Sequence, residues 1–539
     1  TRVITSKIAW LIAHEKISPH SILAVTFTNK AAREMRERAI ALTELCEHVQ
    51  IRTFHSFGAW FLRQHAALAH LSPNFVIYDD EDTKSLIQSM FPNLKGKKAQ
   101  ELAHCIARAK DFALKPDSPG IGKMERQFED FSRYYSEYEN KLKETGNVDF
   151  GGLILEPYSV LQNHPEIQNR VQQRFAYILV DEYQDSNIAQ FQLLKALAGS
   201  ETRVCVVGDD DQSIYRFRGA EVNNILDFPK IFPGTEIIRL EQNYRSYQAI
   251  LDVAQEVVSN NEHRMGKNLV AVKQGGKKPS LTCLDNDIAE AEYCASTIDR
   301  EIKNGRRYAD FAVLYRTNAQ SRIFEQVFTQ QFIPYRVVGA LRFFEREEVK
   351  DALAYASLLM NPQDIVACKR IINKPARGIG EATFANILDL SARNSVSILE
   401  ACKTYSHGSS RAMRGLELFL GIIAALGKAL EESGTLGDFF KTLVRKTGLD
   451  EYYSLKEDND KAENLEELSA ASRTYPASAQ GLLQFIEYSI LDKTQAQSEN
   501  GDYATLITTH NTKGLEFPVV LLTGLEQGLF PRQIGRAHV

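Results

Sequence analysis

Short apolar segments rich in β-branched residues recur along the chain, and each runs into a polar cluster that is followed by helical periodicity. This alternation predicts an α/β protein with parallel sheets that are buried on both faces. The predicted strands are 22–27, 177–180, 203–207, 237–240, 311–315, 506–508 and 519–522. Because ligands of such sheets bind beyond the carboxyl ends of the strands, functional residues are expected in the polar clusters at those ends.

Two long stretches, 58–173 and 360–499, lack this alternation and carry apolar residues at the 3.6-residue spacing of helices. An α/β core interrupted by a helical insertion, occurring twice, predicts two related cores that each carry an accessory domain. The expected domains are a first core at 1–60 and 174–241 with its helical insertion at 61–173, and a second core at 242–359 and 501–532 with its helical insertion at 360–500. The first residues, Thr1 to Ile12, have the pattern of an amphipathic helix.

Composition narrows the class of protein. A chain of 539 residues is long enough for several domains. Its 44% hydrophobic content contains no apolar run near the roughly 20 residues that span a membrane. A formal net charge of −5 excludes a basic coat, so any nucleic-acid site must be a local groove. The seven cysteines are scattered, which favours reduced core residues over a zinc or iron–sulfur site.

Two adjacent carboxylates, Asp181 and Glu182, end the predicted strand 177–180 in the hexapeptide VDEYQD. Nucleotide hydrolysis needs one carboxylate to hold Mg²⁺ and a second to orient and deprotonate the attacking water. Asp181 suits the metal and Glu182 suits the base. An Asp-Glu pair alone is also common where an acidic helix start follows a strand, so the specificity of the signal lies in the full hexapeptide.

The segment 208–220, GDDDQSIYRFRGA, comes after the strand 203–207 and interleaves acids, an amide and aromatic rings. Gln212 can hydrogen-bond both the attacking water and a γ-phosphate oxygen, while Tyr215 and Phe217 offer faces on which unpaired bases can stack. The segment 208–220 would then contact both the nucleotide and the unpaired bases of a nucleic acid. The alternative is a solvated turn for the three aspartates and a core position for the aromatic rings.

Arg245 lies in LEQNYRS, 240–246, after the predicted strand 237–240. A planar, permanently charged guanidinium placed against the γ-phosphate stabilises the charge that develops in phosphoryl transfer, as an arginine finger does. Tyr244 beside it can stack on the adenine. Taken alone, an arginine at a strand end is usually half of a surface ion pair.

In order and spacing, these three segments resemble motifs II, III and IV of the UvrD/Rep/PcrA family of superfamily 1A DNA helicases. The resemblance covers nearly the whole chain and extends to AVTFTNKAA (24–32), TFHS (53–56), YRTNAQSR (315–322), FFEREEVKD (343–351) and THNTKGLEF (509–517), of which the last resembles motif V. It implies two RecA-like cores, 1A and 2A, with helical insertions 1B and 2B. It also implies that ATP and Mg²⁺ bind between the cores.

The resemblance assigns roles that the residues alone do not. It implies catalysis by Glu182, Gln212 and Arg245, nucleotide binding by Thr1, Arg2, Asp181, Tyr244 and Glu516, Mg²⁺ binding by Thr1 and Asp181, and DNA binding by Thr28, Asn29, Phe54, His55, Tyr215, Phe217, Arg218, Gly378, Gly380, Thr509 and His510. Phe54 is the implied base-stacking residue of TFHS. Gly378 and Gly380 match a Gly-Ile-Gly element that approaches duplex DNA in the family, where glycines let backbone N–H groups reach a phosphate. A glycine-rich helix cap explains the same residues.

The chain departs from the family pattern at several places. Residues 1–5, TRVIT, resemble the segment after the lysine of a GxGKT phosphate-binding loop, so Thr1 is expected to supply the Mg²⁺-binding hydroxyl. The glycines and the lysine of that loop are not in the sequence, and the likeness stops at Pro531, before motif VI. We therefore expect a chain cut at both ends that hydrolyses ATP poorly by itself, with a non-native tail at 533–539. Gly151 and Gly152 stand where relatives carry an acidic pair.

The function implied is that of a bacterial ATP-dependent 3′–5′ DNA helicase and single-stranded DNA translocase of repair or replication. Alternatives are the helicase subunit of a helicase–nuclease and, for the chain itself, a DNA-binding scaffold without turnover. DNA-stimulated ATPase activity in the full-length product would separate these classes. The expected partners are single-stranded DNA, single-strand/duplex junctions, and repair or replication proteins. We expect a cytoplasmic, nucleoid-associated monomer or weak dimer with no membrane contact.

Overall fold

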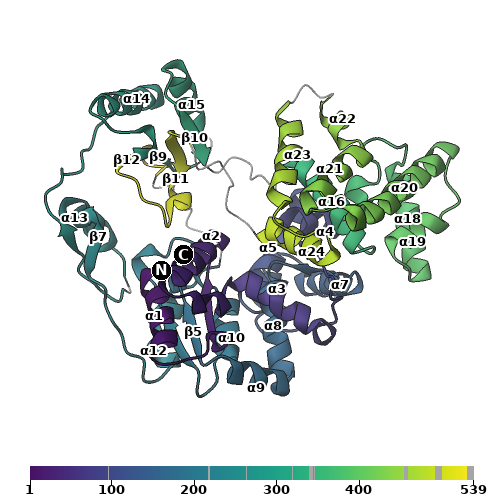
Figure 1. Cartoon of the computed structure of the whole chain (residues 1–539), viewed down its shortest axis with the longest axis horizontal. Helices are drawn as coiled ribbons and strands as arrows, with labels where there is room; N and C mark the ends of the chain where they lie inside the picture. Colours follow the sequence, from purple (N-terminus) through teal and green to yellow (C-terminus); the bar gives the residue numbers. More distant parts are fainter. Residues whose placement is uncertain are drawn as a thin grey trace. The chain divides into compact units, whose positions relative to one another are not determined.

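The computed structural model describes residues 1–94, 96–216, 219–262, 264–317, 320–338, 344, 346–454, 459–491 and 501–530. Two compact units divide the chain, Thr1–Glu236 with Phe344–Thr494 and Ile237–Phe343 with Gln495–Val539. Each unit is therefore built from two segments that lie far apart in the sequence (Figure 1). Within the described ranges, no helix is both long enough and apolar enough to cross a membrane.

A four-stranded parallel sheet forms the core of the first unit, in the order β2-β1-β5-β6. Its strands are β1 (Ile22–Thr26), β2 (Gln50–Thr53), β5 (Tyr177–Val180) and β6 (Arg203–Val206), and the helices around it are α1 (Arg2–Ala13), α2 (Asn29–Leu42), α3 (Phe54–Gln64), α10 (Ile188–Leu197), α11 (Asn223–Leu226) and α12 (Phe228–Ile231). The buried face of α1 contributes Ile4, Ile8 and Leu11 to one cluster with Ile22 and Leu179 of the sheet. The predicted α/β class and the parallel strands are confirmed.

The first helical insertion consists of α4 (Asp80–Met90), α5 (Lys97–Asp111), α6 (Gly122–Glu125), α7 (Phe131–Glu144), α8 (Gly152–Asn163) and α9 (Pro165–Arg174), with a small parallel pair of β3 (Ile77–Tyr78) and β4 (Val148–Asp149). A buried cation lies at its centre. The Lys110 ammonium is 2.7 Å from Asp149 and 2.6 Å from Glu139, and the Lys110 side chain is 1% exposed. Tyr138 donates a further hydrogen bond of 2.9 Å to Asp149, so the buried charges are compensated within the fold.

Gly151 and Gly152 lie directly against the stem of this lysine. A Cβ added at Gly151 would lie 2.7 Å from both Cβ and Cδ of Lys110, closer than such atoms approach in folded proteins. A Cβ at Gly152 would lie 2.6 Å from Val148 Cγ2, and its backbone N–H donates to Asp149 Oδ1 at 2.7 Å. Glycines at these positions therefore leave the room that the aliphatic part of Lys110 fills.

The second helical insertion packs within the same unit. It contains α16 (Glu347–Met360), α17 (Ile365–Ile371), α18 (Glu381–Asn394), α19 (Ile398–Thr404), α20 (Ser410–Glu432), α21 (Leu436–Thr447), α22 (Leu449–Ser454), α23 (Asn459–Ser472) and α24 (Ala479–Leu491). Two polar pairs connect it to the first insertion: Tyr78 donates to Asp364 at 3.0 Å, and Asn361 donates to Asn147 at 2.8 Å. Burial raises the pKa of Asp364 to about 6.

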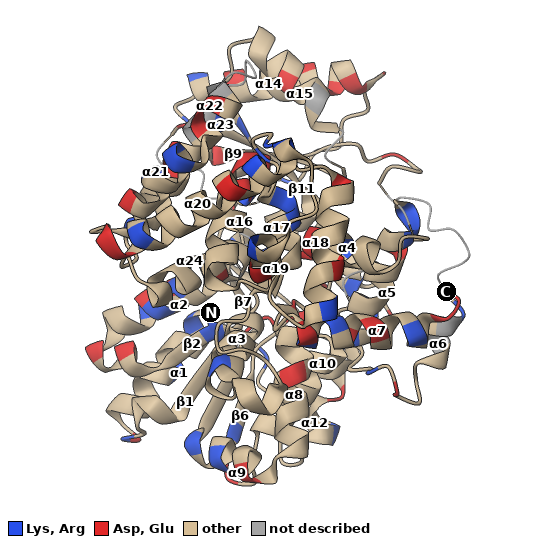
Figure 2. Ribbon diagram, turned by 90° about the vertical axis from the view of Figure 1, so that its right-hand side faces the viewer, with Lys and Arg blue, Asp and Glu red and all other residues tan. Residues whose placement is uncertain are grey.

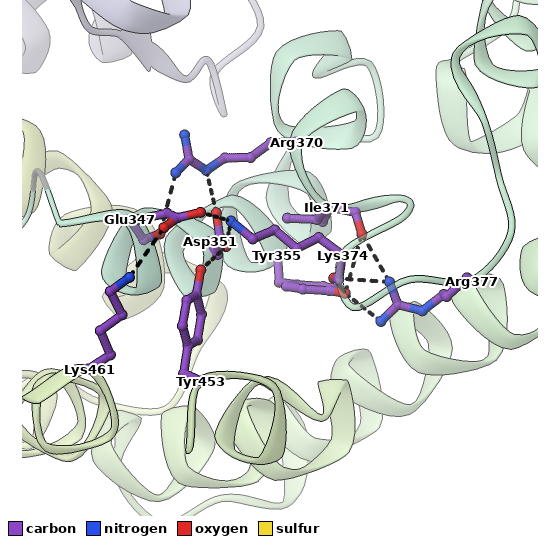
Figure 3. A network of polar contacts seen from close by, with 9 residues as sticks. All are labelled: Glu347, Asp351, Tyr355, Arg370, Ile371, Lys374, Arg377, Tyr453 and Lys461. Carbon is purple, nitrogen blue, oxygen red and sulfur yellow. Dashed lines mark hydrogen bonds and ion pairs between the residues drawn. The ribbon is translucent and has the colours of Figure 1, made fainter. Parts of the chain in front are cut away.

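A second buried carboxylate holds the start of α16. Asp351 is fully buried and accepts from Arg370 at 2.7 Å, from Lys374 at 2.5 Å and from Tyr453 at 2.5 Å (Figure 3). Lys374 also contacts Glu347 at 2.5 Å. Burial, with the hydrogen bond to Asp351, raises the pKa of Tyr453, so the phenol stays a donor. This network joins α16, α17 and α22.

The second unit contains another four-stranded parallel sheet, in the order β10-β11-β9-β12. Its strands are β9 (Phe311–Tyr315), β10 (Tyr335–Val338), β11 (Ala504–Thr508) and β12 (Val519–Leu522), accompanied by α14 (Asp287–Lys303) and α15 (Ser321–Gln330). The yellow strands β11 and β12 flank the teal β9 (Figure 1). A smaller parallel pair, β7 (Gln242–Tyr247) and β8 (Val270–Lys273), precedes it with α13 (Gln248–Val258).

The predicted strand 237–240 is wrong. These residues form no strand, and the side chains of Ile238 and Leu240 are 74% and 60% exposed. The strand of this region begins at Gln242, where β8 offers a pairing edge. An apolar β-branched run becomes a strand only where another strand satisfies its backbone, and the run itself does not specify that partner.

Basic and acidic side chains are mixed on the helices of the first unit. Lys and Arg are interspersed with Asp and Glu along helices of the first unit such as α7 (Figure 2). These helices carry no continuous basic surface. A nucleic-acid site is therefore still expected to be a local groove.

Candidate functional site

Asp181 comes after β5, at the carboxyl edge of the first sheet. Its backbone N–H donates to Val25 at 2.9 Å, which continues the ladder with β1 and fixes the residue in place. The side chain is almost completely buried and accepts a hydrogen bond of 2.8 Å from the Thr1 hydroxyl. A hydroxyl oxygen and a carboxylate oxygen from separate elements thus lie next to each other. Oxygen ligands of this kind are the ones that Mg²⁺ prefers. Arg2, the next residue, is exposed on the first turn of α1.

Glu182 adopts a backbone conformation that is unusual for a residue other than glycine. Its φ of 53° and ψ of 36° lie in the left-handed region, where a residue with a Cβ is strained by on the order of 1 kcal/mol. The side chain is half-buried, and its Oε2 accepts a hydrogen bond of 2.7 Å from the amide nitrogen of Gln184. The two neighbouring carboxylates therefore have different partners, Thr1 for Asp181 and Gln184 for Glu182.

The loop after β6 is joined to this turn. The side-chain oxygen of Gln184 accepts from the backbone N–H of Asp209 at 2.9 Å, and Asp209 in turn accepts from the amide of Gln212 at 2.7 Å. Glu182 and Gln212, which were predicted from separate motifs, are thus connected by a continuous series of hydrogen bonds. The sequence patterns indicated no role for Gln184, although its amide stands two residues after the carboxylate that it contacts.

Tyr215 lies further along this loop and is half-buried. The predicted DNA-binding residues Phe217 and Arg218 lie outside the described residues, so their predicted roles rest on the resemblance alone.

Other residues predicted to contact DNA come after β1 and β2, at the N-termini of α2 and α3. Thr28 caps α2 by accepting from Ala31 at 3.1 Å, and Asn29 is its first residue. His55 lies edge-on to Phe150, with ring centroids 5.6 Å apart. Phe54 is only 3% exposed and packs edge-on against Phe27, so a base could stack on it only after its ring is uncovered.

A basic pocket of about 250 Å³ lies beside these residues in the first unit. Its lining includes Asn29, Lys30, Arg33, Arg36 and Arg52 from the first core, together with Tyr488 from α24. Arg36 is held there because its guanidinium donates to the carbonyl of Ile51 at 3.1 Å. Several cations around a pocket next to Thr28, one of them held by a hydrogen bond, suit a phosphate group of a nucleic-acid backbone.

Arg245 lies within β7 of the second unit, inside a strand rather than after one as predicted. Its Nε donates to Glu516 at 2.8 Å, and both side chains are largely exposed, at 58% and 70%. The structure therefore brings together two predicted site residues from segments 271 positions apart. Tyr244 beside them is 66% exposed, and its hydroxyl donates to Gln242.

Thr509 and His510 form the turn after β11 in the second unit. The His510 Nδ1 lies 3.4 Å from the guanidinium of Arg316, which comes after the neighbouring strand β9. Polar residues after adjacent parallel strands meet here as the strand pattern predicted.

Gly378 and Gly380 lie directly before α18 in the second helical insertion. Gly378 has a φ of 79°, and Gly380 is the N-cap residue of the helix. Arg377 anchors this turn by donating to the carbonyls of Ile371 and Lys374 at 3.0 Å and to Tyr355 at 2.7 Å (Figure 3). The glycines thus serve a helix start. A Cβ at Gly380 would meet no atom within 4 Å, so the backbone there is open to an approaching group, whereas a Cβ at Gly378 would lie 2.6 Å from Arg411.

The predicted site residues thus form separate groups. The structure joins Thr1 to Asp181 and connects Glu182 to Gln212 in the first unit, and it pairs Arg245 with Glu516 in the second. Gly378 and Gly380 lie in the second helical insertion, on different elements from the residues predicted to bind the nucleotide.

Comparison with known proteins gives a consistent result over the whole chain. The family profile of the UvrD/REP helicase N-terminal domain matches residues 1–233, and that of the UvrD-like helicase C-terminal domain matches residues 238–537. DNA helicase II of Haemophilus influenzae is 39% identical over 98% of this chain and 76% of its own length. DNA helicase II of Escherichia coli is 38% identical over 99% and 76%, and the ATP-dependent DNA helicase PcrA of Staphylococcus aureus is 36% identical over 98% and 74%.

Proposed function

The chain belongs to the UvrD/REP helicase family, and we propose that it is the motor of an ATP-dependent DNA helicase that moves 3′ to 5′ along single-stranded DNA in repair or replication. One observation carries the proposal. The strand-end carboxylates Asp181 and Glu182 occur with an amide, Gln212, and hydrogen bonds through two intervening residues connect this amide to Glu182. This is the set of groups that phosphoryl transfer to water requires.

Each residue has a defined task in hydrolysis. Asp181 and Thr1 would hold Mg²⁺, which when bound neutralises charge on the phosphate oxygens. Glu182 orients the attacking water and accepts its proton, and Gln212 contacts the γ-phosphate and that water. Arg245, from the second core, stabilises the charge that develops on the transferred group, while Tyr244 packs on the adenine and Glu516 binds the sugar.

Movement along DNA results from opening and closing of the two cores during the ATP cycle. The cations of the basic pocket hold the backbone phosphates, and bases stack in turn on Tyr215 and Phe217. Phe54 joins this series once DNA uncovers its ring. Separation of a duplex results when the motor steps into a single-strand/duplex junction. The working form is a monomer or weak dimer in the cytoplasm, at the nucleoid.

Glu182→Gln in the full-length gene product tests the catalytic assignment. The isosteric amide cannot accept the proton, so ATP turnover should fall by about 10²- to 10⁴-fold while single-stranded DNA binding is retained. Glu166→Gln on α9, where the carboxylate is 63% exposed, is the matched control and should leave turnover unchanged. Near-normal turnover of the Glu182 variant would remove this residue from the role of base.

The direction of movement is tested with partial duplexes that carry a single-stranded tail on only one end. A motor that moves 3′ to 5′ displaces the strand paired beside a 3′ tail and leaves the 5′-tailed duplex intact. Displacement from the 5′-tailed duplex alone would contradict the proposed polarity. Neither result depends on which repair or replication pathway the protein serves.

A further inference from the structure

We propose that Gln184 is a positioning residue that holds the general base Glu182 and the Gln212 loop as one unit. The inference rests on the proposed function, because it concerns the same hydrolytic site. It adds a residue to which no role in hydrolysis was assigned from the sequence.

The orientation of the Gln184 amide is determined by its surroundings. The side chain is completely buried, and its oxygen faces the backbone N–H of Asp209 at 2.9 Å. A flipped amide would set its NH₂ group against that N–H donor, which is unfavourable, so the nitrogen must point the other way. There it meets Oε2 of Glu182 at 2.7 Å. The amide therefore presents a donor to the base and an acceptor to the loop.

Packing leaves this amide little freedom to move. A Cβ added at Gly208 would lie 2.6 Å from the Gln184 side-chain oxygen, so the backbone of the loop rests directly on the amide. The Ser213 hydroxyl donates to the backbone carbonyl of Gln184 at 3.2 Å. The loop after β6 is thus attached to Gln184 both before and after the short helix that carries Gln212.

Glu182 needs such a contact more than most carboxylates do. It stands on a left-handed backbone, is only half-buried, and reaches the site on a flexible side chain. A hydrogen bond from a fixed amide selects one of its rotamers, and a general base misplaced by 1 Å can lose about a hundredfold in rate. Gln184 therefore supplies an orientation that the backbone alone does not.

The oxygen of the Gln184 amide connects Glu182 to Gln212 through Asp209. Asp209, whose N–H is held by Gln184, accepts from Gln212 with one carboxylate oxygen at 2.7 Å and from the Asp211 N–H with the other at 3.1 Å. A displacement of Gln212 by the γ-phosphate therefore acts on Asp209, the residue whose N–H contacts Gln184. The position of the base becomes dependent on the loop that carries Gln212.

Gln184→Glu separates the two halves of this contact. A carboxylate at 184 still accepts from Asp209 but repels Glu182 from its position. In the full-length gene product, we expect kcat for DNA-stimulated ATP hydrolysis to fall about a hundredfold, as for a base misplaced by 1 Å, while the KM for ATP and the affinity for single-stranded DNA stay within about twofold. Hydrogen exchange of the peptide 207–213 should also stay unchanged. Gln190→Glu is the matched control, because that buried glutamine accepts from Asn187 in a helix cap that glutamate serves equally well.

Two further variants complete the test. Gln184→Met removes both contacts and should lower kcat and also accelerate exchange of 207–213 about tenfold, the effect of one lost hydrogen bond. In the double variant Glu182→Gln with Gln184→Glu, the amide at 182 donates to the carboxylate at 184, so the hydrogen bond is restored with its direction reversed. The thermal midpoint should therefore be higher than in Gln184→Glu alone. The loss of kcat should remain, because the base is absent. Wild-type kcat in Gln184→Glu, or no recovery of the midpoint in the double variant, would overturn the proposal.

The result also separates this proposal from the proposed function. An inactive Glu182→Gln together with a fully active Gln184→Glu would retain Glu182 as base and leave Gln184 a structural residue of the loop. An active Glu182→Gln would reject the base itself. Hydrogen exchange of 207–213 reports on the Asp209 contact in either case, because it requires no turnover.

Discussion

Asp351→Asn tests the buried network at the start of α16. The substitution keeps the size of the side chain but removes a negative charge that contacts both Arg370 and Lys374 from inside the fold. Asp351 is fully buried, whereas these two cations are 29% and 19% exposed. The stability of the contact between α16, α17 and α22 should therefore decrease.

The magnitude can be worked out from the burial of the partners. Removing one member of a buried ion pair costs about 3–5 kcal/mol, because the other charge loses its compensation. Here water reaches both cations in part, and Lys374 keeps Glu347 at 2.5 Å, so the lower end applies. We expect a loss of about 3 kcal/mol in the free energy of opening, which corresponds to roughly a hundredfold faster exchange.

Hydrogen exchange of peptides from α16 and α17 is the appropriate measurement, because it reports the opening of these helices separately from the rest of the chain. Asp389→Asn on α18 is the matched control, since its pair with Arg393 is exposed at both ends and should contribute about 0.3 kcal/mol. An acceleration below about threefold in Asp351→Asn, or one equal to that of the control, would refute the reasoning.

Two further predictions concern other parts of the chain. In the full-length gene product, Arg245→Lys should lower kcat for ATP hydrolysis by about 10³-fold, because a lysine cannot reproduce the planar guanidinium, while the thermal midpoint stays unchanged since the pair with Glu516 is exposed. Arg306→Lys, in a pair with Glu301, is the control, and a loss of stability without a loss of kcat would contradict the finger role. The second concerns the pKa of Asp364, which burial raises from 3.8 to about 6. Its stabilising contribution is then fully present below about pH 4 and is lost as the pH rises through about 6. Hydrogen exchange of α17 peptides, corrected for intrinsic rates, should accelerate relative to that of α20 peptides between about pH 5 and pH 7.5 in the unsubstituted chain. The Asp364→Asn variant should show no such acceleration. An equal acceleration in both proteins would exclude this carboxyl as the cause.

The sheets could be predicted from the sequence because their strands are short apolar runs with polar ends. β5, β9 and β12 begin and end at the predicted residues, and both sheets are parallel as expected. The run at 237–240 has the same composition but pairs with no strand. Periodicity reports which residues suit a strand, whereas the pairing edge is a property of the fold.

The site could be predicted only to the level of residue type. Asp181, Glu182 and Gln212 were found because their chemistry is recognisable in short motifs. Gln184 was missed because its loop partner, Asp209, lies 25 positions away and no local pattern records such a contact. The burial of Phe54 was missed for a similar reason, since the ring of Phe27 that covers it belongs to a different part of the chain.

The glycines at 151 and 152 and the lysine at 110 constrain one another across about 40 positions of chain. Because the methylene groups of Lys110 occupy the volume that side chains at 151 would need, neither site can be altered in size without adjustment at the other. Chimeras that exchange α8 with a relative bearing larger residues at these positions should therefore import α5 as well. The size of the residue at 151 and the path of the Lys110 side chain therefore have to change together.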